Sequence, residues 1–303
     1  MTTPTFPPSP DLSQTPAIPP VSKLDRTPEI GLPLELGLGP KITPVVLSDE
    51  DEGAWRALGA ELDAWGTSGA TATLWWRNDQ AFDVVPTLRR VRELSENLAI
   101  PLALSVIPAT ATKDLAWWVG NWRHVTVFQH GFAHVNQAVA GDRSGELVAN
   151  RPLEEVMAEI KQGAERLRSL FGKQFLAVLV PPWNRIGVGV VAALPGLGIV
   201  GLSGFRTIKT VPAGIVEVCT HVDPINPRGG EFIGTRRTIE DLTAHLRARR
   251  LGVEVAHQPT GLLTCDQALN EPAWAFVERL LTVTKSHPAA RWLSAGEVFG
   301  GGA

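Results

Sequence analysis

Short runs of hydrophobic residues recur along the chain from residue 72 onward. Each run is rich in leucine, β-branched or aromatic side chains and is apolar at consecutive positions, which is typical of strands buried on both faces. We therefore predict strands at 72–76, 102–107, 125–129, 175–180, 199–202, 215–219 and 261–264, and a weaker one at 291–293.

Segments with apolar residues at helical spacing separate most of these runs. One of them, 152–171, carries acidic residues in its first half and basic residues in its second half, an order that complements a helix dipole. A further segment near the start places Trp55, Leu58, Leu62 and Trp65 on one helical face. We predict helices at 49–65, 84–98, 113–121, 152–171, 187–194, 238–250 and 272–284.

The alternation of strands and helices indicates an α/β fold with a parallel sheet that helices cover on both faces. Seven or eight strand–helix units in about 250 residues favour a closed or nearly closed (β/α) barrel over an open sheet. No G-x-G-x-x-G or G-x-x-x-x-G-K motif follows a predicted strand, which removes support for nucleotide-binding folds.

Residues 1–44 differ from the rest of the chain in composition. They are rich in proline, threonine and serine, and each proline removes a backbone donor while adding little to a core. We expect 1–44 to form a disordered or extended arm and 45–303 to form the barrel domain.

The 303-residue chain is 44% hydrophobic and 19% charged, with a formal net charge of −3. It has no block of basic residues, so we expect no nucleic-acid partner. It has no run of 18 apolar residues, so we expect no membrane span. The N-terminus lacks the positive start and apolar core of a secretory signal, so we expect a cytoplasmic protein.

The candidate chemistry begins at a strand end. The run at 125–129 leads into His130, a glycine turn and His134, and Asp79 follows the run at 72–76. Catalytic groups of (β/α) barrels lie at the carboxyl ends of the strands. Two imidazoles and a carboxylate bind a divalent metal and leave positions open for water and substrate. We predict His130, His134 and Asp79 as metal ligands, with zinc as the first choice among zinc, cobalt, nickel and iron. The alternative is a histidine pair that only makes hydrogen bonds at a helix start.

Four segments, in this order, resemble the motifs of the polysaccharide deacetylase family, the NodB-like metal-dependent carbohydrate esterases. The second is the most specific, because the family uses a strand-end H-x-x-x-H for its metal. The resemblance implies a distorted (β/α) barrel, a divalent metal, and removal of an acetyl group from an N-acetylated carbohydrate or related amide. The segments are Arg77-Asn78-Asp79-Gln80, His130-Gly131-Phe132-Ala133-His134, Pro181-Pro182-Trp183-Asn184-Arg185 and Gly261-Leu262-Leu263-Thr264.

The chain departs from the family's pattern in its acid–base residues. The family has two consecutive aspartates after the first strand, one a base and the next a metal ligand. Here the segment reads Asn78-Asp79-Gln80. Either Asn78 replaces the base and Asp79 binds the metal, or Asp79 is the base and Gln80 replaces the ligand. The arginine that usually opens the proline-rich motif is also missing, and Arg185 is its only nearby substitute.

The family places a histidine just after its penultimate strand, as the acid that protonates the leaving amine. This chain has no histidine there, and His221 is the candidate replacement, with its pKa raised by Asp223 two residues on. The alternative is that His221 and Asp223 form only a turn before Pro224.

The proline-rich segment is the expected substrate contact, because Trp183 at a strand end can stack on the apolar face of a sugar ring. The alternative is that Trp183 is a core tryptophan at a helix N-terminus. Pro182, Asn184 and Arg185 are the other candidates in it. The loop from 135 to 152, which contains two glycines, is expected to be mobile and solvated.

Two interpretations follow for the whole protein. One is a metal-dependent deacetylase with an altered acid–base set, and the other is a non-catalytic carbohydrate-binding or regulatory protein that kept the barrel. We favour the enzyme, because the imidazole pair is kept. The sequence indicates no oligomeric state.

Overall fold

The computed structural model describes residues 48–148, 150–205, 211–227, 229–253 and 258–300. The arm expected at 1–44 lies outside the described residues. In the described part, no helix is long and apolar enough to cross a membrane.

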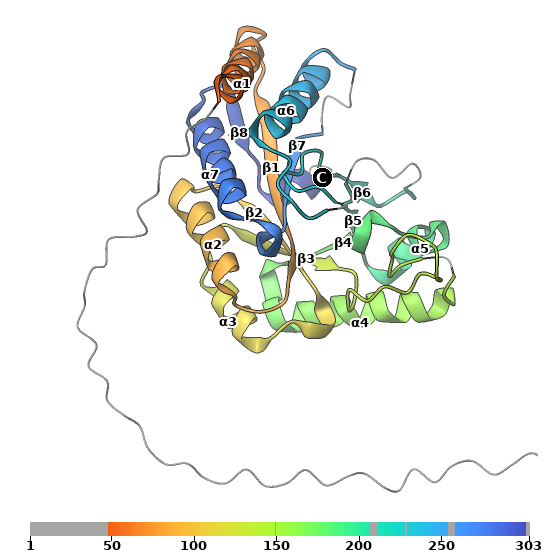
Figure 1. Ribbon diagram of the computed structural model, residues 1–303. Coiled ribbons are helices and arrows are strands. Elements are labelled where there is room, and N and C mark those ends of the chain that lie inside the picture. Colours follow the sequence, from red (N-terminus) through yellow and green to blue (C-terminus); the bar gives the residue numbers. More distant parts are fainter. Residues whose placement is uncertain (1–47, 149, 206–210, 228, 254–257, 301–303) are drawn as a thin grey trace, which may run out of the picture. The chain divides into compact units, whose positions relative to one another are not determined.

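The described strands are parallel and form one curled sheet in the order β6-β5-β4-β3-β2-β1-β7, with β8 paired to the beginning of β1 (Figure 1). The predicted α/β class and distorted (β/α) barrel are confirmed. The strands are β1 (Ala72–Ala81), β2 (Leu102–Val106), β3 (Val125–His130), β4 (Phe175–Val180), β5 (Gly201–Leu202), β6 (Val216–Glu217), β7 (Thr260–Thr264) and β8 (Ala290–Trp292).

The gap between β6 and β7 is bridged by the irregular segment after β6. Thr220 pairs with Phe205, and Val222 pairs with Leu262 of β7, each as a single parallel bridge. The Leu263 amide then donates to the Val222 carbonyl at 2.8 Å. The barrel is therefore closed on this side by isolated bridges and not by a full ladder, which accounts for its distortion.

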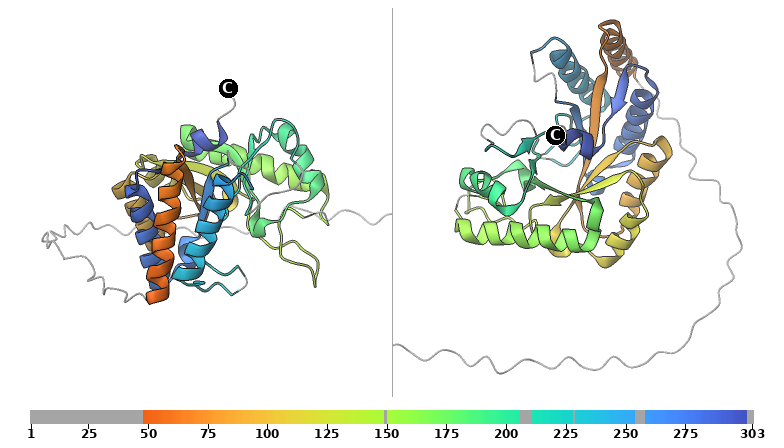
Figure 2. Two further views of the ribbon diagram at one scale, coloured as in Figure 1. Left: turned by 90° about the horizontal axis from the view of Figure 1, so that it is seen from above. Right: turned by 180° about the vertical axis from the view of Figure 1, so that it is seen from behind.

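Helices cover the outer face of the sheet (Figure 2). The bounds of the first seven agree with the predicted segments to within a few residues, because the hydrophobic period that predicts a helix also buries it, and the eighth was not predicted. The helices are α1 (Asp49–Thr67), α2 (Pro86–Leu98), α3 (Lys113–Gly120), α4 (Leu153–Phe171), α5 (Val188–Ala193), α6 (Thr235–Arg250), α7 (Glu271–Ser286) and α8 (Ala295–Phe299).

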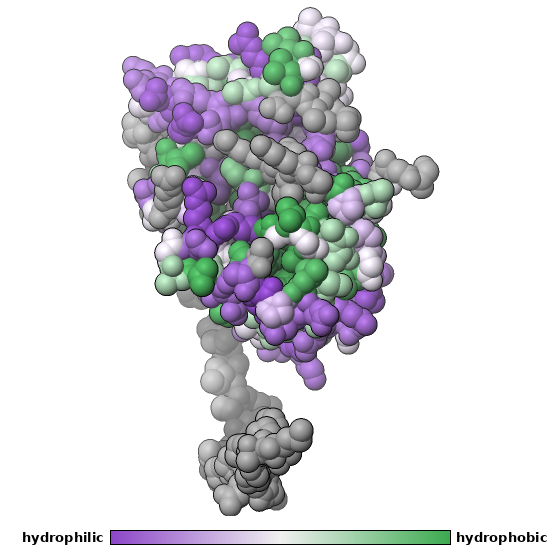
Figure 3. Space-filling model, turned by 90° about the vertical axis from the view of Figure 1, so that its right-hand side faces the viewer, coloured by the Kyte–Doolittle hydropathy of each residue, from purple (hydrophilic) through white to green (hydrophobic). Residues whose placement is uncertain are grey.

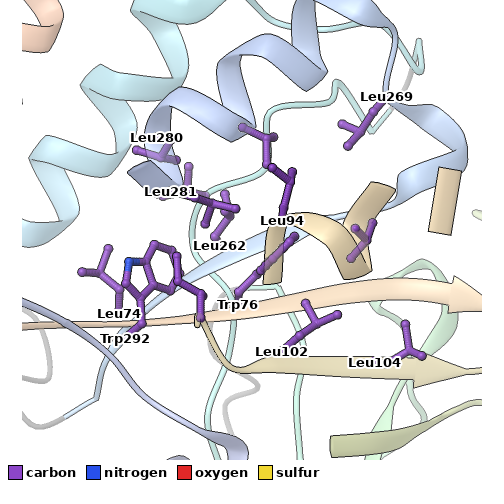
Figure 4. Packing of buried hydrophobic residues seen from close by; sticks show 14 of the residues in the cluster. Leu74, Trp76, Leu94, Leu102, Leu104, Leu262, Leu269, Leu280, Leu281 and Trp292 are labelled. Atoms are coloured by element: carbon purple, nitrogen blue, oxygen red, sulfur yellow. The ribbon is translucent and has the colours of Figure 1, made fainter. Parts of the chain in front are cut away.

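The main core lies between the sheet and these helices. Leu74 and Trp76 of β1 and Leu102 and Leu104 of β2 point outward into it, where leucines of α2 and α7 meet them (Figure 4). Alternate positions of the same strands point into the barrel, because successive side chains of a strand face opposite sides.

A smaller apolar cluster fills the half of the barrel interior that is nearer the amino ends of the strands. Phe299 of α8 meets the rings of Trp75 and Phe128 edge to face, with centroids 5.9 and 5.3 Å apart. A Cβ at Gly201 would come within 2.7 Å of Phe299, so β5 is glycine at this point of close approach. The apolar filling ends below the level of Arg77, and the polar site begins there.

Candidate active site

The inward face of β1 carries the centre of the site. Trp75, Arg77 and Asp79 alternate along this face, so the apolar filling is followed by a cation and then by a carboxylate. Arg77 donates from Nε and Nη2 to the two oxygens of Asp79, at 2.8 and 3.0 Å. Arg77 and Asp79 are only 2% and 7% exposed, so solvent screens this pair little.

Arg77 is itself anchored across the barrel. Its Nη1 donates to the Ser203 hydroxyl at 2.6 Å, to the Ser203 carbonyl at 2.9 Å and to the Gly204 carbonyl at 3.2 Å. The segment after β5 therefore fixes the guanidinium, and the guanidinium fixes the Asp79 carboxylate. We assigned no role to Arg77 from the sequence. The available signal was a charged residue two positions before Asp79 in an apolar strand, which the period of a strand places on the same face.

Asn78 points the other way, into the layer between the sheet and α2. Its Nδ2 donates to Asp266 at 2.8 Å, and its Oδ1 accepts from the Thr264 hydroxyl at 2.8 Å and from the Asp266 amide at 3.1 Å. The Thr87 hydroxyl donates to the other Asp266 oxygen at 2.6 Å. Asn78 is thus a buried cross-link between β1 and the loop after β7, and Asp79 is the carboxylate that faces the barrel interior.

His130 is the last residue of β3 and is 3% exposed. Its Nδ1 lies 3.1 Å from the hydroxyl of Ser105 on β2, which orients the ring. The rings of His130 and His134 stack with centroids 5.1 Å apart. Nε2 of each ring is buried and has no hydrogen-bond partner.

Burial lowers the pKa of His130 to about 3, while nearby Asp79 works against the shift and His134 and Arg77 add to it. Burial also lowers the pKa of His134, and Asp79 again opposes it. Both imidazoles are therefore neutral at pH 7, which is the form that binds a metal.

Trp183 lies over the second histidine. Its ring stacks on that of His134 at 4.3 Å, and the tryptophan is 41% exposed, so one part of the indole covers the site and another reaches the surface. Hydrophobic and hydrophilic side chains are mixed on the face of the molecule seen in Figure 3.

The other residues of the proline-rich segment are engaged within the protein. Pro182 is buried against Gly131. The Asn184 amide bonds the Phe205 backbone twice, donating from Nδ2 and accepting at Oδ1, both at 2.7 Å. Arg185 donates to the Arg143 carbonyl. Of the four residues predicted to bind substrate, Trp183 is the one whose ring is both exposed and in contact with a site histidine.

Positive φ angles gather at this edge of the barrel. Outside glycine, the described residues with positive φ include Gln80 near the end of β1, His134 after β3, and Trp183 and Asn184 after β4. Such conformations carry strain, which folded proteins retain most often where function requires a particular geometry. The Gln80 carbonyl accepts a hydrogen bond from the Gln267 side-chain amide at 3.3 Å.

His221 is not brought to this site. Its Nδ1 accepts from the Gly261 amide at 3.0 Å, and its ring stacks on His245 of α6 at 3.9 Å. Gly261 pairs with Trp75, which lies four residues before Asp79, or about 13 Å along the strand.

Asp223 is within electrostatic range of the Arg77–Asp79 pair. Burial raises the pKa of Asp223 to about 7, and the charge of Asp79 adds to this shift. The hydrogen bond that Asp223 accepts from the Ile225 amide at 2.9 Å opposes it. The carboxyl group thus changes protonation close to neutral pH, as a proton donor or acceptor must.

The loop between β3 and α4 contains a buried carboxylate that the sequence analysis did not single out. Glu146 is 2% exposed and accepts from the Phe132 amide at 3.0 Å and from the Ala133 amide at 2.7 Å. Leu147 and Val148 are also buried, so the prediction of a solvated loop throughout 135–152 is wrong for this stretch. A lone glutamate in a glycine-containing loop gave no local signal of burial.

The donors present fit a divalent metal in part. Two neutral imidazole nitrogens are buried without partners, which is the condition of ligands that await an ion. Asp79 stands beside them, but both of its oxygens already accept from Arg77. Consistently, the described residues contain no preformed group of three or more His, Cys, Asp or Glu side chains that could hold a metal. The residues that fit such an ion are therefore His130 and His134, with Asp79 as a neighbouring carboxylate.

Solved structures share this architecture. A putative polysaccharide deacetylase from Mycobacterium smegmatis aligns over 77% of this chain and 90% of its own, with a TM-score of 0.57 and 14% identity. Puue allantoinase aligns over 75% of this chain and 88% of its own, with a TM-score of 0.54 and 13% identity. The fold is that of the polysaccharide deacetylases. No protein-family model and no curated protein sequence matches the chain.

Proposed function

We propose that the protein is a metal-dependent hydrolase that removes an acetyl group from an N-acetylated carbohydrate or a related amide. The observation that carries the proposal is the pair of buried, unpartnered Nε2 atoms of His130 and His134 beside the Asp79 carboxyl group at the carboxyl edge of a parallel barrel. The shared fold supports the reaction class by analogy.

His130 and His134 would hold the metal, with zinc as the first choice. A bound divalent metal polarises the acetyl carbonyl and lowers the pKa of water at the site to about 7. The burial that keeps both imidazoles neutral favours this role, because a protonated imidazole cannot bind a metal.

Asp79 acts as the base that takes the proton when water attacks. Each of its oxygens accepts one bond from Arg77 and keeps a second lone pair for that proton. Because Arg77 already bonds both oxygens, we assign Asp79 the role of base in place of the third metal ligand predicted for it. Arg77 thus orients Asp79.

Asp223 supplies the proton that the leaving amine needs. The predicted acid was His221, but its ring is engaged by Gly261 and His245 at another level of the barrel. Asp223 is within electrostatic range of Asp79 and Arg77 and holds its proton up to about neutral pH. Trp183, exposed above His134, presents an aromatic face to a sugar ring.

The decisive experiment measures the metal content of the purified protein after incubation with zinc, cobalt or nickel. We expect about one metal per chain, lost in a His130→Ala, His134→Ala variant, and acetate release from an acetylated sugar by the loaded protein. Wild-type protein that retains no metal would overturn the hydrolase proposal.

A specific observation favours a second candidate, a non-catalytic carbohydrate-binding or regulatory protein. The Arg77–Asp79 pair engages both oxygens of the carboxylate that stands beside the two site histidines. In that case the wild-type protein binds acetylated oligosaccharides with the same affinity in EDTA as with metal, and Trp183→Ala weakens the binding.

A further inference from the structure

Glu146 lies beneath the turn that joins the two site histidines. One of its oxygens accepts from the Phe132 amide and the other from the Ala133 amide, so these two bonds fall between His130 and His134, and the backbone of Val135, just after His134, is a further hydrogen-bond partner. The carboxylate is 2% exposed and therefore holds these amides in a nearly dry environment, where such bonds are strong.

Gly131 shows how closely the carboxylate approaches the turn. Its φ is +54°, and a Cβ there would lie 2.0 Å from a Glu146 oxygen and 2.5 Å from Pro182. The histidine turn is thus clamped between the Glu146 carboxylate on one side and the proline-rich segment on the other. His134, three residues after Gly131, also has a positive φ, of +55°.

The residues around Glu146 connect the two loops that meet at the site. Gln137, three residues after His134, donates its amide to the Gly145 carbonyl at 2.8 Å. Leu147 pairs with Ile186, and the Gly187 amide donates to the Leu147 carbonyl at 2.7 Å. Glu146 therefore stands in a segment bonded both to the histidine loop and to the stretch just after Trp183.

We propose that Glu146 is a positioning residue that sets the distance and orientation of His134 relative to His130, and with them the metal affinity of the pair. The inference rests on the proposed function, because it concerns the same two imidazoles. Glu146 acts through the Phe132 and Ala133 amides, which lie between the two positive-φ residues of the turn, Gly131 and His134.

The test uses Co²⁺ as the probe and Glu146→Gln as the variant. The glutamine keeps the size of the side chain but turns an NH₂ toward one of the two amides, so one bond is lost. Glu61→Gln is the matched control, because Glu61 is also a buried carboxylate with two bonds, here to Arg250 between α1 and α6. We measure Co²⁺ affinity by titration, the visible Co²⁺ spectrum, and thermal unfolding of the metal-free proteins.

We expect Glu146→Gln to lower Co²⁺ affinity about 10- to 100-fold and to change the Co²⁺ spectrum, the range known for residues that orient metal ligands. Glu61→Gln should lower only the unfolding temperature. If wild-type protein binds no Co²⁺, the proposed function fails, and this inference fails with it. If wild type binds Co²⁺ and Glu146→Gln binds equally well, or Glu61→Gln weakens binding as much, the positioning role is overturned while the function stands.

Glu146→Asp replaces the glutamine variant if the latter does not fold. The aspartate keeps the charge, but its shorter stem cannot reach both amides. Weakened Co²⁺ binding in this variant supports the positioning role, and wild-type affinity overturns it.

Discussion

The barrel interior changes character between its two ends. Toward the amino ends of the strands, Phe299, Trp75 and Phe128 meet edge to face, and the filling is apolar. Toward the carboxyl ends, the same strands present an ion pair, two imidazole nitrogens without partners and several backbones at positive φ. One end is built for stability, whereas the other retains strain and unsatisfied polar atoms that a ligand would satisfy.

The first prediction tests whether the two ends are independent. Phe299→Ala should lower the free energy of unfolding by about 3 to 5 kcal/mol, because it leaves a cavity between Trp75 and Phe128. Urea unfolding measures the loss. Co²⁺ affinity of the folded variant should equal that of wild type, and a parallel loss of affinity would show that the apolar end also shapes the site.

A somewhat smaller loss is expected at the polar end. Arg77→Met leaves the Asp79 carboxylate buried without its cation and should lower the free energy of unfolding by about 3 kcal/mol. Adding Asp79→Leu should recover part of this loss, since it removes the unpaired charge. A double-mutant cycle by urea unfolding checks both statements. A loss under about 1 kcal/mol for Arg77→Met alone would mean that the Arg77–Asp79 pair stabilises the fold no more than an exposed ion pair does.

The third prediction concerns Asn78 on the outward face of β1, next to Asp79 on the inward face. Asn78→Asp restores two consecutive aspartates but removes the donor to Asp266 and sets two carboxylates against each other. We expect a loss of about 1 to 3 kcal/mol in stability and no gain in acetate release. Increased acetate release would mean that residue 78 reaches the substrate, contrary to its direction in the structure. Asn78→Ala is the control for loss of the hydrogen bonds without the added charge.

The last prediction concerns the pH dependence of stability. The pKa of Asp223 is about 7 in the folded protein against an ordinary 3.8, so this group favours the folded state below pH 3.8 and loses that contribution as pH rises through 7. In EDTA, Asp223→Asn should therefore gain stability relative to wild type as the pH is raised from 4 to 8. Parallel stability curves for the two proteins over this range would contradict the prediction.

Much of the architecture was predictable because its signals are local. Consecutive apolar runs predicted the strands, and helical periodicity predicted the helices between them. The gathering of His130 and Asp79 at one edge also followed from the sequence, since parallel strands end on the same side of a sheet. The sequence left open whether Asp79 is the base or a metal ligand, because the position of Asp79 in the chain does not show which side chain its oxygens bond.

What the sequence by itself determined is therefore the barrel class, the approximate positions of its strands and helices, and the place of His130 at a strand end. The tertiary structure alone decided the partners: Ser203 anchors Arg77 from 126 residues away, and Glu146 grips the histidine turn. It also places His221 and Asp223, which are two residues apart in sequence, in different surroundings. The physical reason is that these contacts arise only when the barrel closes and brings distant segments together, and no local pattern of hydrophobicity encodes which polar groups will then meet.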